Sequence, residues 1–102
     1  MTSSGSPYAR FRRAIATQNL ALIDTAAREL PALGLHDALQ IVVIMGRTSD
    51  RRYRLAAARW SARATAELRL DVDEARRVLS LLEVLPRAPD AVGAELAELC
   101  RR

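Results

Sequence analysis

The chain has 102 residues, half of them apolar, and its formal net charge is +4. Its single cysteine and single histidine exclude an internal disulfide and a zinc site built from the usual Cys and His ligands. The charge is uneven, because residues 47–63 hold six arginines and one acid while residues 64–102 are net acidic.

The first two predicted helices form a hairpin. Ser6 followed by a proline is a helix-start signal, because serine accepts hydrogen bonds from free amides and proline loses nothing at the first helical position. A helix is therefore predicted over residues 7–17, preceded by a disordered tail over residues 1–6. Asn19 can cap a second helix over about residues 20–30, which ends at a proline.

The third segment, LHDALQIVVIMG, is the place where strand and helix compete, because its centre is β-branched and apolar throughout. No other segment alternates with a period of two, so a strand here would have no partner. We expect residues 35–45 to form a helix buried on most sides, at the centre of the fold, and closed by Gly46.

The fourth predicted helix begins near Ser49 or Asp50 and runs to about Arg69. Its apolar residues fall on one face at helical spacing. They are Tyr53, Ala57, Trp60, Ala64 and Leu68.

Two further helices complete the chain. Asp71 and Glu74 predict a capping box for the fifth helix, which ends at Pro86, and a sixth runs over about residues 89–101. Their expected core residues are Ala75, Val78, Leu79, Leu82 and Leu85, then Val92, Leu96, Leu99 and Cys100. The prediction is an all-α fold, a compact bundle of about six short antiparallel helices that forms one domain over residues 7–102.

The strongest candidate site is the basic fourth helix. Arg52, Arg59 and Arg63 fall in a narrow sector beside the Tyr53 and Trp60 stripe, so they form a row of guanidinium groups with aromatics at its edge. Such a row can bind phosphates or carboxylates. The alternative is that the arginine stems cover the rim of the core and Trp60 is a core residue. The predicted anionic-partner surface comprises Arg47, Arg51, Arg52, Arg54, Arg59 and Arg63.

A second basic cluster lies on the first helix, in the string YARFRR. Arg10, Arg12 and Arg13 alternate with Tyr8 and Phe11, a pattern compatible with stacking on bases. The alternative is that Phe11 belongs to the core and the arginines are solvated.

The third candidate is a helix-turn-helix over residues 65–79, TAELRLDVDEARRVL, which would place Asp73, Arg76 and Arg77 nearest a major groove. The motif prefers glycine where this chain has Arg69, because a left-handed backbone is costly for a residue with a Cβ. Asp73 is also expected to neutralise Arg77, one turn away.

No enzyme class is indicated. The chain has no glycine-rich phosphate loop, no second histidine and no ligand cluster, so we expect no catalytic site, no cofactor and no metal. It also lacks an apolar run of transmembrane length and a signal peptide, so a cytoplasmic protein without membrane contact is expected.

The string FRRAIATQNLALIDTAARELPALGLHDALQIVVIM, followed by RYRLAAARWSAR, resembles short all-helical proteins of uncharacterised role from high-GC actinobacteria. The resemblance covers roughly residues 10–86. It implies a helical fold and carries no activity, cofactor or site.

The sequence is compatible with two functions. The first is a non-enzymatic adaptor or regulatory module whose arginine-rich fourth helix docks an acidic protein partner or a second copy of itself. The alternative is a DNA- or RNA-binding regulatory protein that uses the same face. The first is favoured, because reading DNA normally requires a docking element and the candidate here departs from the motif at its turn.

Overall fold

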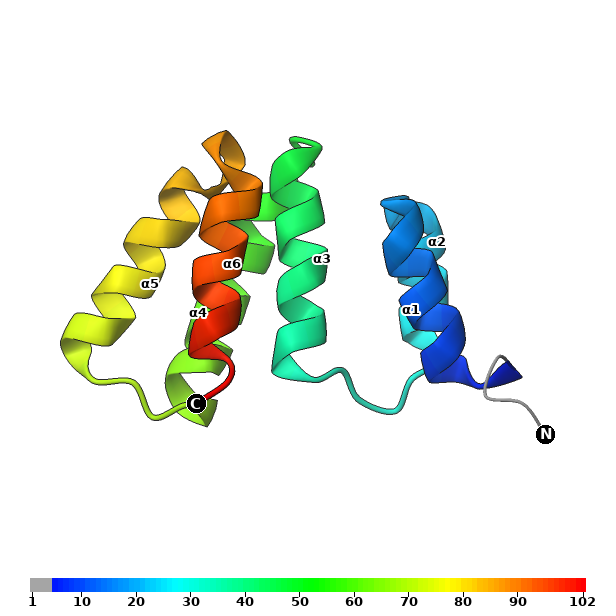
Figure 1. The fold of residues 1–102 in the computed structure, drawn as a ribbon, viewed down its shortest axis with the longest axis horizontal. Coiled ribbons are helices and arrows are strands. Elements are labelled where there is room, and N and C mark those ends of the chain that lie inside the picture. Colours follow the sequence, from blue (N-terminus) through cyan, green and yellow to red (C-terminus); the bar gives the residue numbers. More distant parts are fainter. Residues whose placement is uncertain (1–4) are drawn as a thin grey trace. The chain divides into compact units, whose positions relative to one another are not determined.

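The computed structural model describes residues 5–102, and this part of the chain is helical without a strand (Figure 1). Its elements are α1 (Pro7–Thr17), α2 (Leu20–Arg28), α3 (Leu35–Arg47), α4 (Tyr53–Glu67), α5 (Val72–Val84), the 3-10 helix η2 (Leu85–Arg87) and α6 (Pro89–Leu99). The predicted all-α fold is confirmed, with six α-helices in the described residues. The first four residues of the predicted disordered tail lie outside the described range. By their internal contacts the residues form two units, one up to Gly34 and one from Leu35 onward.

The first unit is the hairpin of α1 and α2. Its start is as predicted, with the Ser6 hydroxyl accepting from the Ala9 amide at 3.0 Å and proline at the first helical position. The Asn19 side chain caps α2 as expected. The Arg10 guanidinium joins the two helices by donating to the Glu29 carboxylate at 2.8 Å.

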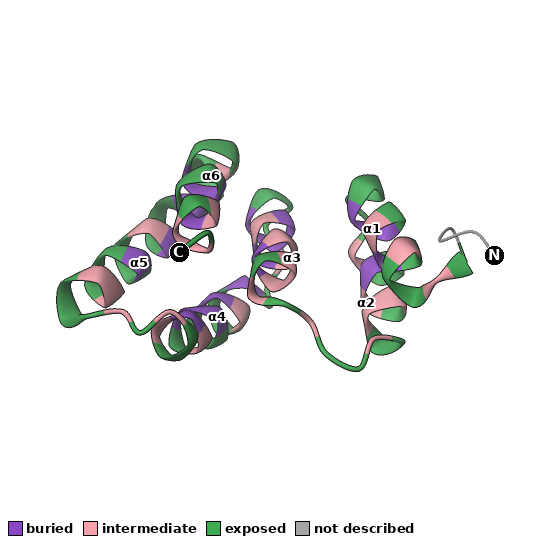
Figure 2. Ribbon diagram, turned by 60° about the horizontal axis from the view of Figure 1, so that its bottom comes forward, coloured by how far each residue is buried: buried purple, intermediate pink, exposed green. Residues whose placement is uncertain are grey.

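The second unit is built around α3, which packs against α4, α6 and η2. The helix prediction for the β-branched segment is therefore confirmed, and so is the prediction that it is largely buried: Leu39, Val42, Ile44 and Met45 are all in the core. Figure 2 shows buried and exposed positions alternating along the helices, as expected for helices that each contribute one face to a core.

Two aromatic side chains fix α4 in this unit. The Trp60 indole N–H donates to the Leu35 carbonyl at 2.9 Å, and the Tyr53 hydroxyl donates to the Leu82 carbonyl at 2.5 Å. In an uninterrupted α5, the Leu82 carbonyl would accept from the amide of residue 86, but Pro86 has none. The Tyr53 hydroxyl therefore satisfies a buried carbonyl that the proline leaves without a donor.

Gly46 does not close α3, contrary to the prediction. The helix continues through Arg47, and the left-handed residue that follows is Ser49, with φ 56°. Gly46 is instead a packing position, because a Cβ there would overlap the side chain of Leu85 and lie 3.1 Å from Tyr53 Cε1. The absence of a side chain lets α3 approach its neighbours closely.

The start of α4 is also later than predicted, at Tyr53. The residue before the helix, Arg52, has a helical backbone and makes no side-chain cap. Asp50, expected to begin the helix, accepts the Arg52 amide at 2.8 Å and so stabilises the turn that leads into it.

Three of the tight turns contain a non-glycine residue in the left-handed region: Gln18, Ser49 and Arg69, with φ of 60°, 56° and 51°. A residue with a Cβ in this region costs about 1 kcal/mol relative to glycine. The chain therefore has several turns whose sequence is not optimal for their backbone.

Replacing Arg69 with glycine is expected to raise the free energy of unfolding by about 0.5–1 kcal/mol, because glycine adopts the left-handed backbone without strain. Urea denaturation followed by helical circular dichroism measures the change. The matched control is Arg76→Gly, which puts glycine inside α5 and is expected to lower stability by about 1 kcal/mol. Equal losses from both variants would contradict the left-handed assignment of Arg69.

Candidate functional site

The six arginines of the predicted anionic-partner surface lie at the end of α3, on the turn after it and on α4. Three of them form ion pairs: Arg47–Asp90 at 2.7 Å, Arg52–Asp50 at 3.0 Å and Arg63–Glu67. The remaining three, Arg51, Arg54 and Arg59, form no ion pair within residues 5–102. Two members of the predicted guanidinium row are thus neutralised, and Arg59 alone of that row has no carboxylate.

The acids of these pairs are held in their charged form. A side-chain hydrogen bond from Arg52, with one from its backbone amide, lowers the pKa of Asp50 below its usual range. The hydrogen bond from Arg47 does the same to the pKa of Asp90. Both carboxylates remain ionised at neutral pH, so the paired arginines are matched by a full negative charge.

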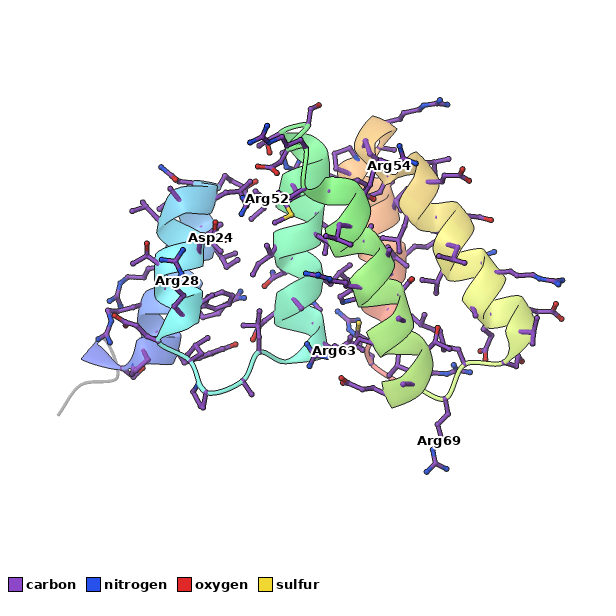
Figure 3. All side chains as sticks on the ribbon, turned by 180° about the vertical axis from the view of Figure 1, so that it is seen from behind. Asp24, Arg28, Arg52, Arg54, Arg63 and Arg69 are labelled. Atoms are coloured by element: carbon purple, nitrogen blue, oxygen red, sulfur yellow. The ribbon has the colours of Figure 1, made fainter. Side chains whose placement is uncertain are left out.

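The arginines also differ in direction. Arg52 and Arg63 lie on the side of α4 that is away from α5, whereas Arg54 lies toward α5 (Figure 3). Arg69 lies at the opposite end of α4 from Arg54 and points away from the helices (Figure 3). Arg54 therefore lies apart from Arg52 and Arg63, the two labelled members of the predicted row, which share one side of α4.

A groove of about 170 Å³ runs between α4 and α5. Its lining is mainly apolar, with one charged side chain contributed by each helix. The residues are Tyr53, Arg54, Ala57, Ala58, Leu79, Leu82 and Glu83. We call this feature the α4–α5 groove.

Leu79 was expected in the core, but it is 54% exposed at the edge of this groove. Leu55, on the outward face of α4, is 58% exposed. On that face Ala58, Ala62 and Ala66 follow Leu55 at helical spacing, and all are exposed. The pattern was available in the sequence as a second apolar stripe on the same helix, opposite the stripe that contains Tyr53 and Trp60.

A larger groove of about 410 Å³ lies between α5 and α6, but the charges that line it are largely matched. Arg77 pairs with Glu95 at 2.6 Å, and Arg102 pairs with Glu74. Glu98 forms an ion pair with Arg101 at 2.5 Å. These pairs hold α5, α6 and the chain end together, which explains the acidic residues of this region without a ligand.

We expect the buried Tyr53 hydroxyl to ionise at an unusually high pH. Burial raises the pKa of Tyr53 to about 12, above the ordinary value of about 10. The folded chain holds this proton more tightly than the unfolded chain, so its contribution to stability is complete below about pH 10 and is lost as the pH rises to about 12. The phenolate absorbance of the wild type minus that of Tyr53→Phe should show this late ionisation. A Tyr53 step near pH 10 would contradict it.

The secondary basic patch, Arg10, Arg12 and Arg13, lies on α1. Arg10 is paired with Glu29, and the ring of Phe11 is fully buried. Tyr8, with its ring centroid 6.2 Å from that of Phe11, is half exposed. Of the two aromatic rings between these arginines in the sequence, only that of Tyr8 is therefore available at the surface.

The helix-turn-helix alternative concerns α4, α5 and the turn between them. Arg69 does adopt the left-handed backbone that the motif requires, and the predicted capping box is present, with the Asp71 carboxylate accepting from the Glu74 amide at 2.8 Å. Asp73 and Arg76 are exposed. Arg77 pairs with Glu95 rather than with Asp73, so the expected neutralisation comes from α6.

The single histidine and the single cysteine of the chain lie at the ends of different helices. His36 is exposed near the start of α3, and Cys100 lies half-buried at the end of α6, where burial raises the pKa of its thiol. A raised pKa disfavours the reactive thiolate. Within residues 5–102 no group of three or more His, Cys, Asp or Glu side chains could hold a metal. In the same range, every helix is too short or too polar to cross a membrane.

On α4 and α5 the structure thus has an apolar groove and an outward apolar stripe, and three arginines of the predicted surface without ion pairs lie on α4 and the turn before it. No family model matches the chain, and neither a curated protein nor a solved structure shows significant similarity to it.

Proposed function

We propose that this chain is a non-enzymatic helical interaction module that docks an acidic protein partner on the outward face of α4. The observation that carries the proposal is Arg59, an exposed arginine without a carboxylate partner in residues 5–102, one helical turn from the exposed Leu55. Arg51 lies on the turn that leads into α4, four residues before Leu55 in the chain, and also lacks an ion pair. An apolar anchor between cations suits a partner that presents an apolar side chain flanked by carboxylates.

The use of acids elsewhere in the chain supports an anionic partner. Of all the aspartates and glutamates, only Asp73 and Glu83 lack a hydrogen bond or ion pair in the described residues. Arginines without an ion pair are more numerous, and several of them lie on α4, α5 and the adjoining turns: Arg51, Arg54, Arg59, Arg69 and Arg76. Of these arginines, Arg51 and Arg59 flank the exposed apolar stripe, so two cations without an ion pair lie beside it.

The apolar stripe favours protein over nucleic acid as the partner. Leu55 and the exposed alanines of α4 would gain nothing from a phosphate backbone, whereas a protein helix can bury them. Tyr53 and Trp60, the aromatics beside the arginines, are both in the core and cannot stack on bases.

Fluorescence polarisation with three labelled probes tests this proposal. The probes are a helical peptide with a leucine stripe flanked by glutamates, a DNA duplex and a single-stranded RNA. We expect the peptide to bind best. Changing Arg51 and Arg59 together to glutamine should weaken peptide binding about fivefold, since each exposed ion pair contributes about 0.5 kcal/mol.

The matched control changes Arg28 and Arg87, two other exposed arginines without ion pairs, to glutamine, which removes the same charge and should leave binding unchanged. Tighter binding of DNA or RNA than of the peptide, with a steep loss of affinity as salt rises, would replace the proposal with the nucleic-acid alternative. In that case Arg76→Gln would test the helix-turn-helix reading.

A further inference from the structure

The α4–α5 groove carries opposite charges on its two walls. Arg54 lines it from α4 and Glu83 lines it from α5. Neither side chain forms a hydrogen bond or an ion pair within residues 5–102, although both face the same groove. Such an arrangement suits a partner that presents a carboxylate to Arg54 on the α4 wall and a cation to Glu83 on the α5 wall.

We propose that this partner is a second copy of the chain, docked groove to groove. The two charges stand at the same level, because α4 begins at Tyr53 where α5 ends, and the Tyr53 hydroxyl donates to the Leu82 carbonyl at 2.5 Å. A two-fold axis parallel to the groove places α4 of each copy against α5 of the other, and it leaves every residue at the same height along the groove. It therefore brings Arg54 of each copy to Glu83 of the other, and both ion pairs form in one dimer.

The same operation matches the apolar part of the groove. Leu79 projects from the α5 wall and is 54% exposed, while the exposed Ala58 lines the α4 wall. Exchange of the walls places Leu79 of each copy over Ala58 of the other, a large side chain against a small one. The α4 and α5 helices of the two copies then form a four-helix arrangement that buries both leucines.

This inference goes beyond the proposed function and uses different charged residues, although Ala58 borders both surfaces. The dimer takes up Arg54, Leu79 and Glu83 in the groove, whereas the acidic partner is assigned to Leu55, Arg51 and Arg59 on the outward face. The Arg51 and Arg59 double glutamine variant should therefore keep the dimer intact. Each proposal can fail without the other.

Sedimentation equilibrium of the full chain over a concentration series tests the dimer. The wild type should approach twice the 11.3 kDa mass of one chain. Arg54→Glu replaces both ion pairs with carboxylate pairs, and Glu83→Arg replaces both with guanidinium pairs. Each variant should raise the dimer dissociation constant about thirtyfold, and Arg28→Glu, the matched control, should leave it unchanged.

Two recombinations of these variants make the test specific. The double variant Arg54→Glu with Glu83→Arg restores both pairs in reversed order, so it should dimerise like the wild type. An equimolar mixture of the two single variants should form a heterodimer, because each copy then offers the charge that the other needs. The mixture also separates the proposal from misfolding, since a misfolded chain would not regain its partner on mixing.

Three results would overturn the proposal. The first is a mass of one chain throughout the concentration series. The second is a dimer that both single variants leave unchanged, which would place the interface elsewhere. The third is two monomeric single variants whose mixture stays monomeric while circular dichroism shows native helix content.

Discussion

Replacing Gly46 with valine should lower the free energy of unfolding of the α3–α6 unit by about 3 kcal/mol, as overpacking of a tight core does. A Cβ at this position overlaps the Leu85 side chain and approaches Tyr53 Cε1 to 3.1 Å. Leu85 has no exposed surface and Tyr53 is held by its bond to Leu82, so neither can move aside without disturbing the core. Urea denaturation followed by circular dichroism measures the loss.

Gly34 is the matched control for this change. A Cβ there meets nothing within 4 Å, and its φ is not positive. Gly34→Val should therefore change the free energy of unfolding by less than about 0.5 kcal/mol. If Gly46→Val were as harmless as the control, the close approach of α3 to η2 and α4 would be wrong.

Truncating Trp60 to alanine should cost about 4 kcal/mol of stability, since the side chain is 3% exposed and leaves a large cavity. The change also leaves the Leu35 carbonyl without the indole donor that now lies 2.9 Å away. Thermal unfolding followed by circular dichroism measures the effect, because the variant has lost the only tryptophan of the chain.

Trp60→Phe separates the two parts of this cost. It keeps most of the apolar volume and removes the hydrogen bond, so a loss of about 1–2 kcal/mol is expected. In the wild type, adding DNA or RNA should leave the tryptophan emission unchanged, because the ring is in the core. A large change in emission on adding nucleic acid would show that Trp60 reaches the ligand, and would contradict its burial.

Much of the fold could be predicted from the sequence, because local rules act in concert along the chain. Ser6 before α1, Asn19 before α2 and the Asp71–Glu74 capping box of α5 each supply acceptors for the free amides at a helix start, and the structure uses them as predicted. The core stripe of α4 was also visible as spacing alone. Tyr53, Ala57, Trp60 and Ala64 are all buried.

What could not be predicted depends on contacts between elements. Gly46 and Ser49 show this for the turns: helical propensity favoured ending α3 at the glycine, but tight packing against Leu85 needed the glycine inside the helix. Leu79 is an example from the core. Its position on α5 fits the apolar face of that helix, but it lies exposed at the edge of the α4–α5 groove, and the spacing of the sequence does not contain the placement of α4.

The charges of the candidate site show the same limit. The sequence has one acid among the six arginines of residues 47–63, but Asp90 of α6 pairs with Arg47, the last residue of α3, across forty-three residues of chain. The site residues that remain without ion pairs are thus a subset of those predicted. Glu83 and Leu79, which complete the groove, were not among them because nothing local distinguishes them from solvated or core positions.

The bond from the Tyr53 hydroxyl to the Leu82 carbonyl has a consequence for motion. It joins the start of α4 to the end of α5, and the short turn around Arg69 joins their other ends. Neither helix can fray at the proline without breaking this bond, so the two should open together in native-state hydrogen exchange, with one shared opening free energy for their inner amides. In Tyr53→Phe, the last turn of α5 should exchange faster and independently of α4.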